Sequence, residues 1–247
     1  MRDVADIEVG AIVMAGGRSE RMRAGGSADH KSLRTVRGAP LIEWNLRALL
    51  DCGFRRLFVA FNAREHALAE WLADRGLTLC RQHSSALQLL VEDEPLGTIG
   101  AVRLLPADVQ NAVVVNVDNL TTLDLGELLR THVEKGAAAT IATHTHAFRM
   151  PFGMLEVQGQ RVTAYREKPE LPVVISSGTY ALHRRAIVRV PAGRRSDVPA
   201  LIASLLEDGE VVAAHPHREP WIDVNDEAAL VQAEELFGSL HAERAAS

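Results

Sequence analysis

The chain has 247 residues, 47% of them hydrophobic, and a formal net charge of −5, so it is long and apolar enough for a sizeable core. The negative charge argues against nucleic acid or an anionic membrane as a partner, and no apolar run approaches the roughly 20 residues of a membrane span. Two cysteines are too few for a disulfide framework and the acidic start has no signal-peptide pattern, so we expect a cytoplasmic protein.

The first predicted element is a buried strand that runs into paired glycines. Residues 11–14 are apolar, and Gly16 and Gly17 leave backbone N–H groups free to face an anion. Three cations stand nearby in the sequence: Arg18, Arg21 and Lys31. The pattern predicts a phosphate-binding loop that is neither a Walker A loop nor Gly-x-Gly-x-x-Gly. The alternative is an ordinary strand-to-helix turn with solvated arginines.

Strands and helices alternate through the rest of the first half. Further strands are predicted at 59–61, 77–80 and 112–115, and helices at 41–50, 65–72, 99–105 and 125–133. This order is typical of right-handed βαβ units, so we predict an α/β fold with a mostly parallel sheet. Ligands of such sheets bind outside the carboxyl ends of the strands.

After about residue 137, short strands replace the long helices. Candidates are 140–143, 153–157, 162–165, 173–175 and 179–182, followed by helices near 198–206 and 227–237. We predict a mixed-sheet extension of the first half. Because no linker or repeat divides the chain, we expect one domain over 1–247, with halves at about 9–136 and 137–240.

Two aspartates follow short apolar runs and are candidate metal ligands. Asp118 comes after the run at 113–115, and Asp223 ends the run at 220–222. A carboxylate in this position can hold Mg²⁺, which bridges phosphate oxygens. A helix cap at Asp118 and an Asx turn at Asp223 explain the two residues equally well from the sequence alone.

Other polar patterns are less specific. The loop at 94–101 opens a predicted helix whose N-terminus could face an anion or a base, or be capped by Thr98. Glu167 and Lys168 follow a predicted strand, where charged turns are usually solvated. For the Arg184–Arg185 pair and the two His-x-His pairs at 144–146 and 215–217, we favour surface or hydrogen-bonded side chains over a phosphate rim or a metal site.

Taken in order, these segments resemble the sugar-1-phosphate nucleotidyltransferases from about Ala11 to Phe237. The family has a glycine-rich loop ending in arginine, a lysine, a Pro-Leu-Gly-Thr-x-Gly-Ala loop, an aspartate, Glu-Lys-Pro, Asn-Ala-Gly and Trp-x-Asp. The matching positions here are 16–21, 31, 95–101, 118, 167–169, 177–178 and 221–223. The similarity is greatest to single-domain members that use GTP to activate mannose-, heptose- or glucosamine-type 1-phosphates. It implies a Rossmann-like, GT-A-like fold with helices flanking a mixed, mostly parallel sheet.

The resemblance also implies roles for the matched residues. The nucleotide would contact Ala15, Gly16, Gly17, Arg18, Ser19, Arg21, Lys31, Leu96, Gly97 and Thr98. The sugar phosphate would contact Asn119, Gly153, Glu167, Lys168, Ser177 and Gly178, which makes 137–240 the sugar-phosphate-binding half. Asp118 and Asp223 would bind Mg²⁺. The catalytic set would be Arg21, Lys31, Asp118, Lys168 and Asp223.

The implied reaction transfers a nucleotidyl group from an NTP, expected to be GTP, to a sugar 1-phosphate, and releases pyrophosphate. Several positions depart from the family pattern, among them Glu20, Val117, Ser176 and Asn225, and those on the sugar side suggest an unusual sugar. Residues 18–22 also resemble molybdopterin guanylyltransferase, which is one alternative. A non-catalytic module that binds a nucleotide or a sugar phosphate is the other. The sequence leaves the oligomeric state open, a homo-oligomer included.

Overall fold

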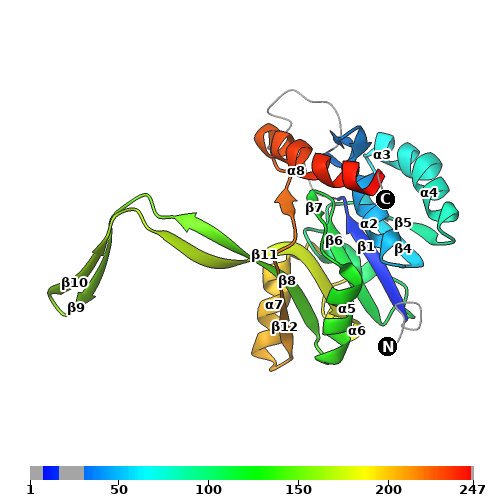
Figure 1. The fold of residues 1–247 in the computed structure, drawn as a ribbon. Helices are drawn as coiled ribbons and strands as arrows, with labels where there is room; N and C mark the ends of the chain where they lie inside the picture. Colours follow the sequence, from blue (N-terminus) through cyan, green and yellow to red (C-terminus); the bar gives the residue numbers. More distant parts are fainter. Residues whose placement is uncertain (1–7, 17–30, 246–247) are drawn as a thin grey trace.

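A seven-stranded sheet forms the centre of the molecule, in the order β12-β8-β11-β6-β1-β4-β5 (Figure 1). The structure is a computed structural model, and it describes residues 8–16 and 31–245. Its strands are β1 (Val9–Met14), β4 (Arg56–Asn62), β5 (Ala86–Glu92), β6 (Asn111–Asn116), β8 (Ala139–Arg149), β11 (Glu170–His183) and β12 (Val212–His217). All pairs are parallel except those that β11 makes with β6 and β8. The α/β class and the mixed, mostly parallel sheet are thus confirmed.

Both faces of the sheet are covered, which explains the unbroken apolar run in β1. Val9, Ala11 and Val13 pack in one buried cluster with α2 (Leu41–Asp51), α3 (His66–Trp71) and α5 (Leu125–Glu134). Ile12 and Met14 point to the other face, toward α6 (Arg184–Ile187) and α7 (Val198–Glu207). Because successive side chains of a strand alternate between faces, one short strand serves both clusters.

The predicted strand at 77–80 is wrong. This segment is the helix α4 (Leu77–Gln82), which continues α3 through a π-helical stretch, η3 (Leu72–Gly76). The buried positions Leu72, Gly76 and Leu79 recur at helical spacing, a pattern that a four-residue window cannot show. The parallel strand that the sequence analysis missed is β5, an edge strand whose residues alternate in exposure. The predicted helix at 99–105 is only a 3-10 turn, η4 (Gly100–Leu104).

The predicted strands at 173–175 and 179–182 are parts of one long strand, β11, which pairs with β8 over most of its length. The register shifts between Ser176 and Tyr180, close to the point where the pair leaves the body of the protein. Beyond it, the two strands lead to the hairpin β9 (Met154–Gln158) and β10 (Arg161–Arg166). Residues 145–175, here called the arm, project away from the body (Figure 1).

A separate group of short strands and a short helix, together with the long C-terminal helix, covers the upper edge of the sheet (Figure 1). It contains η2 (Lys31–Leu33), β2 (Thr35–Val36), β3 (Ala39–Pro40), β7 (Asn119–Thr121), β13 (Trp221–Asp223) and α8 (Glu227–Ala245). A third buried cluster, which includes Val36, Leu120, Val224 and Phe237, holds this group together. No helix within the described ranges is long and apolar enough to cross a membrane.

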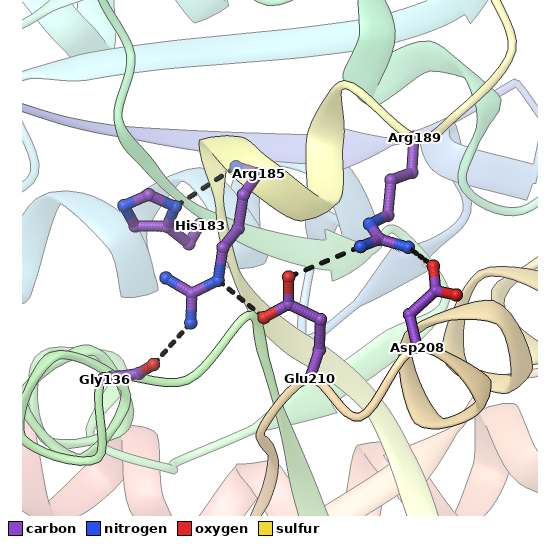
Figure 2. Close-up of polar contacts among 6 residues, drawn as sticks. All are labelled: Gly136, His183, Arg185, Arg189, Asp208 and Glu210. Carbon is purple, nitrogen blue, oxygen red and sulfur yellow. Dashed lines mark hydrogen bonds and ion pairs between the residues drawn. The ribbon is translucent and has the colours of Figure 1, made fainter.

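The arginines near 184 take part in structural ion pairs (Figure 2). Arg185 donates to Glu210 at 3.0 Å and to the carbonyl of Gly136, while Arg189 pairs with Asp208 and reaches Glu210 at 3.4 Å. Arg184 donates to the carbonyls of Leu105 and Pro106. The cluster lies at the end of β11 that pairs with the start of β6, opposite the carboxyl ends of the parallel strands. These arginines therefore fasten α6 to its surroundings and form no phosphate rim.

Acid should destabilise the protein through His132. Burial, with smaller effects of His183 and Arg185, lowers the pKa of this side chain from 6.5 to about 4, and its Nδ1 lies 2.9 Å from the hydroxyl of Thr140. The unfolded chain binds the proton more tightly, so stability present above pH 6.5 is lost as the pH falls toward 4, by about 3 kcal/mol in all. Denaturant unfolding of His132→Gln between pH 7 and 4.5 should show a smaller loss than wild type. The exposed-site control His66→Gln should keep the wild-type slope.

Candidate active site

The carboxyl ends of four parallel strands bring polar residues to one edge of the sheet. Met14 of β1 is in register with Asn116 of β6, so Gly16 and Asp118 emerge side by side. Asn62 of β4 is in register with Glu92 of β5, which ends the next two strands at the same edge. Parallel sheets of this kind bind ligands there.

A chain of hydrogen bonds links the predicted catalytic residues of the body. Lys31 Nζ donates to Asp118 Oδ2 at 2.7 Å and to Asn225 Oδ1 at 3.1 Å, and Asn225 Nδ2 donates to Asp223 Oδ2 at 2.7 Å. The pairing of β13 with β7 sets Asp223 opposite Asn119, next to Asp118. Residues separated by almost 200 positions in the sequence thus form one polar group.

Asp223 is the most electrostatically strained member of this group. Burial raises the pKa of its carboxyl group and nearby Asp118 raises it further, while Asn225 and Lys31 oppose the shift. Its Oδ1 is buried and has no hydrogen-bond partner within the described residues. Two close carboxylates with one oxygen unsatisfied are a donor set suited to a hard divalent cation. No group of three or more His, Cys, Asp or Glu that could hold a metal occurs in the part of the chain that the structure describes.

Glu92 lies directly behind Gly16 and was missed by the sequence analysis. A Cβ added to Gly16 would stand 2.5 Å from Glu92 Oε1, so only glycine allows this approach. The carboxylate is buried, accepts from the backbone N–H of Leu96 at 2.8 Å, and has a pKa raised by burial. Glu92 ends an apolar run, which is the same signal that singled out Asp118. The sequence analysis missed it because it placed a strand at 77–80 and none at β5. Four predicted nucleotide contacts, Gly17, Arg18, Ser19 and Arg21, lie outside the described residues.

The loop at 96–98 is held by its own chain. Two of its backbone N–H groups, those of Leu96 and Thr98, donate to the carboxylates of Glu92 and Asp197. The Thr98 hydroxyl in turn accepts from the N–H of Val198, so the loop and the start of α7 cap each other. These two amides therefore support the loop, and the side chain of Leu96 is buried in the core cluster behind it.

Gly178 packs against two asparagine side chains at the same edge. Its φ is +72°, and an added Cβ would collide with the Asn119 amide and stand 3.1 Å from Asn116 Nδ2. Neighbouring Ser177 is buried, donates to the carbonyl of Ala142 at 3.0 Å and accepts from His217 Nε2 at 3.1 Å. The side chain of Ser177 thus positions this stretch of β11. Asn116, which the sequence analysis overlooked, lies here beside the predicted contact Asn119.

The histidines pair across strands. His144 and His217 are register partners on β8 and β12, and their ring centroids are 5.4 Å apart. Trp221 closes this group, because its Nε1 donates to the carbonyl of Ser177 at 2.8 Å and its ring lies 5.9 Å from that of His144. The group stands behind Ser177 and supports the turn that carries Gly178.

The remaining predicted sugar contacts lie on the arm. The Tyr165 hydroxyl donates to Glu167 Oε2 at 2.6 Å and also lies against Gly153, so these residues form a small polar cluster. Lys168 follows with a φ of 41°, a conformation that non-glycine residues rarely adopt. The structure therefore divides the predicted site into a body part around Lys31, Asp118, Asn119 and Asp223 and an arm part around Glu167 and Lys168.

Comparison with known proteins agrees with this fold. The nucleotidyl transferase family matches residues 10–238. The chain belongs to this family. Mannose-1-phosphate guanylyltransferase of Mycobacterium tuberculosis is 28% identical over 213 residues, which cover 84% of this chain and 58% of that protein. D-glycero-α-D-manno-heptose 1-phosphate guanylyltransferase of Aneurinibacillus thermoaerophilus is 24% identical over 160 residues, 64% of this chain and 67% of that protein. The chain spans little more than half the length of several curated relatives.

Solved structures share the fold of this nucleotidyl transferase. HddC from Yersinia pseudotuberculosis, crystallised in complex with GMP-PN, superposes with a TM-score of 0.69 at 21% identity, covering 92% of this chain and 99% of that one. A second structure of the same protein gives 0.68 at 22% identity. The overlap extends over both halves of the chain, so the sheet and its flanking helices follow the family's architecture.

Gly178 allows a matched test of the turn beside the asparagines. Gly178→Ala should cost at least about 3 kcal/mol of unfolding free energy, because the methyl group meets Asn119 in an already unfavourable backbone conformation. Gly209 has the same φ of +72° but open space around it, so Gly209→Ala should cost only about 1–2 kcal/mol. Equal losses in denaturant unfolding would show that the Asn119 contact adds nothing.

Proposed function

We propose that this nucleotidyl transferase joins a sugar 1-phosphate to the nucleotidyl group of an NTP, with GTP as the donor. The observation that carries the proposal is the hydrogen-bonded chain Asp118–Lys31–Asn225–Asp223 at the carboxyl edge of the sheet. It puts a cation and two carboxylates beside Gly16, which follows the end of β1. The nucleotide would bind to the half at about 9–136 and the sugar phosphate to the half at about 137–240.

The reaction needs no side-chain nucleophile. A phosphate oxygen of the sugar 1-phosphate attacks the α-phosphorus in line, the new P–O bond forms, and the bond from the α-phosphorus to the bridging oxygen breaks. Pyrophosphate leaves with that oxygen, and the NDP-sugar remains. The protein has to hold two anions together and stabilise the charge of the leaving group. Lys31, with Arg18 and Arg21 of the loop, would bind the triphosphate, while Asn119 and Gly178 would line the sugar side.

Asp118 and Asp223 would hold Mg²⁺, and Lys31 would then turn from Asp118 to the phosphates. The unsatisfied buried Oδ1 of Asp223 supports this assignment, because a cation would satisfy it. Bound Mg²⁺ would neutralise phosphate charge during the displacement. A guanine nucleotide is supported by the relatives: two are guanylyltransferases, and a solved structure of the same fold carries GMP-PN. The cytoplasmic location stays an expectation.

The direct test is pyrophosphate release with Mg²⁺, crossing four NTPs and dTTP against hexose, aminohexose and heptose 1-phosphates. Release should require GTP and one sugar phosphate together. Asp118→Asn should lower the rate at least about 100-fold, because a metal and Lys31 both lose a charged partner. Asp108→Asn is the matched control, since this exposed aspartate pairs with Arg56 near the opposite edge, and it should retain full activity. Full activity of Asp118→Asn would contradict the metal assignment.

A lack of pyrophosphate release with every pair of substrates in the panel would contradict the sugar-phosphate proposal. Retained GTP binding would then favour a binding module of the same fold, and release with molybdopterin as acceptor would favour that alternative.

Mg²⁺ should also stabilise the folded protein through Asp223. Without metal, Asp223→Asn should raise the melting temperature, because it removes a buried charge next to Asp118. With Mg²⁺ at 100 times its Kd, wild type should gain about 2.7 kcal/mol, and the variant should gain little. Thermal unfolding with and without Mg²⁺ measures both effects. A wild-type protein that gains nothing, or a variant that is less stable without metal, would contradict the assignment.

A further inference from the structure

The arm exposes large apolar side chains of the kind that folded proteins normally bury. Of the fifteen large hydrophobic residues exposed in the described chain, eight lie within 145–175: Phe148, Phe152, Leu155, Val157, Val162, Tyr165, Val173 and Val174. Four of them share one face of the hairpin, because Leu155 pairs with Tyr165 and Val157 with Val162. A two-stranded hairpin alone is marginally stable in water, so this apolar face calls for a partner surface.

The opposite face of the hairpin is polar. Arg166 pairs with Glu156 at 2.7 Å across the strands, and both side chains are more than half exposed. The hairpin is therefore amphipathic, with one face suited to burial and one suited to solvent. Outside 145–175, the same two strands pair with β6 and β12, but no sheet pairing in the described residues covers the outer edges of the arm. Such open edges add main-chain groups that a partner strand or loop can use.

The arm also carries two residues that the proposed reaction needs at the body. Lys168 precedes Gly178 by ten positions, nearly all within the extended strand β11, which corresponds to roughly 30 Å at 3.3 Å per residue. Figure 1 shows the hairpin on the far side of this span from the edge where β6 and β7 meet. With β8 and β11 paired as they are, Glu167 and Lys168 do not reach Asp118 and Asp223 of their own chain.

We infer that two copies of this chain exchange arms, so that Glu167 and Lys168 of one copy complete the sugar-phosphate site of the other. The inference rests on the proposed function, since it takes the arm residues as ligands of the same substrate. The receiving site has to offer Asp118, Asp223 and Lys31, and the body of a second copy supplies it. In the completed site, the ammonium group of Lys168 would face the phosphate of the sugar 1-phosphate, whose negative charge it complements.

Two-fold symmetry makes this exchange close on itself. Each copy offers one arm and one incomplete site, so a pair satisfies both and leaves no arm free. The apolar hairpin face would be buried against the receiving body, and the Glu156–Arg166 face would remain in water. The polar cluster of Gly153, Tyr165 and Glu167 would arrive already formed, because its internal hydrogen bond does not depend on the partner.

Complementation between two inactive variants tests the exchange. Chains that carry Asp118→Asn and Lys168→Ala bear different tags, are co-expressed, and are purified on both tags in succession. Each variant alone should be nearly inactive. In the mixed pair, the intact body of one chain meets the intact arm of the other, so pyrophosphate release should reach about half of the wild-type rate.

The mirror control combines wild type with the double variant Asp118→Asn/Lys168→Ala, tagged and purified in the same way. With exchanged arms, every site of this pair has one defect, so activity should be almost lost. With each arm folded over its own body, the outcome reverses: this pair keeps half of the activity and the first pair stays inactive. That reversal, or a wild-type enzyme that is active as a monomer, would overturn the inference.

Oligomeric state separates this inference from the proposed function. Val157→Lys charges the apolar hairpin face and should convert dimers to monomers in sedimentation velocity, whereas Leu206→Lys, at a similarly exposed position on α7, should leave dimers intact. If Val157→Lys breaks the dimer and no substrate pair in the panel releases pyrophosphate, the arm contact is retained and the proposed reaction is rejected. An active wild type whose dimer is unaffected by Val157→Lys would reject the arm contact and retain the reaction.

Discussion

The parallel register of β1 and β6 is the constraint on which the rest of this protein depends. Because Met14 stands opposite Asn116, the glycine turn after one strand and Asp118 after the other emerge at the same edge. Burial of both strands on both faces fixes this register, since a slip of one residue would exchange the side chains that face the two apolar clusters. The short pair β7–β13 then extends the edge and adds Asp223.

The same edge is where the protein tolerates unfavourable electrostatics. Glu92 and Asp223 are both largely buried carboxyl groups with a raised pKa, and each has one oxygen without a partner in the described chain. At the other end of the sheet, Glu210 is paired with both Arg185 and Arg189. Buried carboxyl groups with a raised pKa are typical of functional sites. These two carboxyl groups support our proposal that the site lies at this edge, and this support does not depend on a family resemblance.

The arm is a second part of the fold that lacks a partner, because its apolar side chains are exposed to solvent. The outer parts of β8 and β11 form the arm, and the inner parts of the same strands are paired in the central sheet, which fixes the base of the arm. The outer parts expose apolar residues to solvent. The register shift at Ser176–Tyr180 coincides with the turn that places Gly178 against Asn119. The base of the arm and the sugar side of the proposed site are therefore formed by the same few residues. A change in the direction of the arm would thus change the geometry of the site.

The sequence by itself determined the α/β class, the buried strands β1 and β6, the helices α2, α5 and α7, and the grouping of Lys31, Asp118 and Asp223 as candidates. Each of these has a local signal: an apolar run, a helical period, or an acidic residue after a strand. It could not separate helix from strand at 77–80, because four residues cover barely one helical turn and cannot show a repeat, and it therefore missed β5 and Glu92. Only the tertiary structure decided that Asn225 bridges Lys31 and Asp223, and that Glu167 and Lys168 stand apart from the body. Contacts between distant residues depend on strand order and on where β11 leaves the sheet, and no local pattern encodes either.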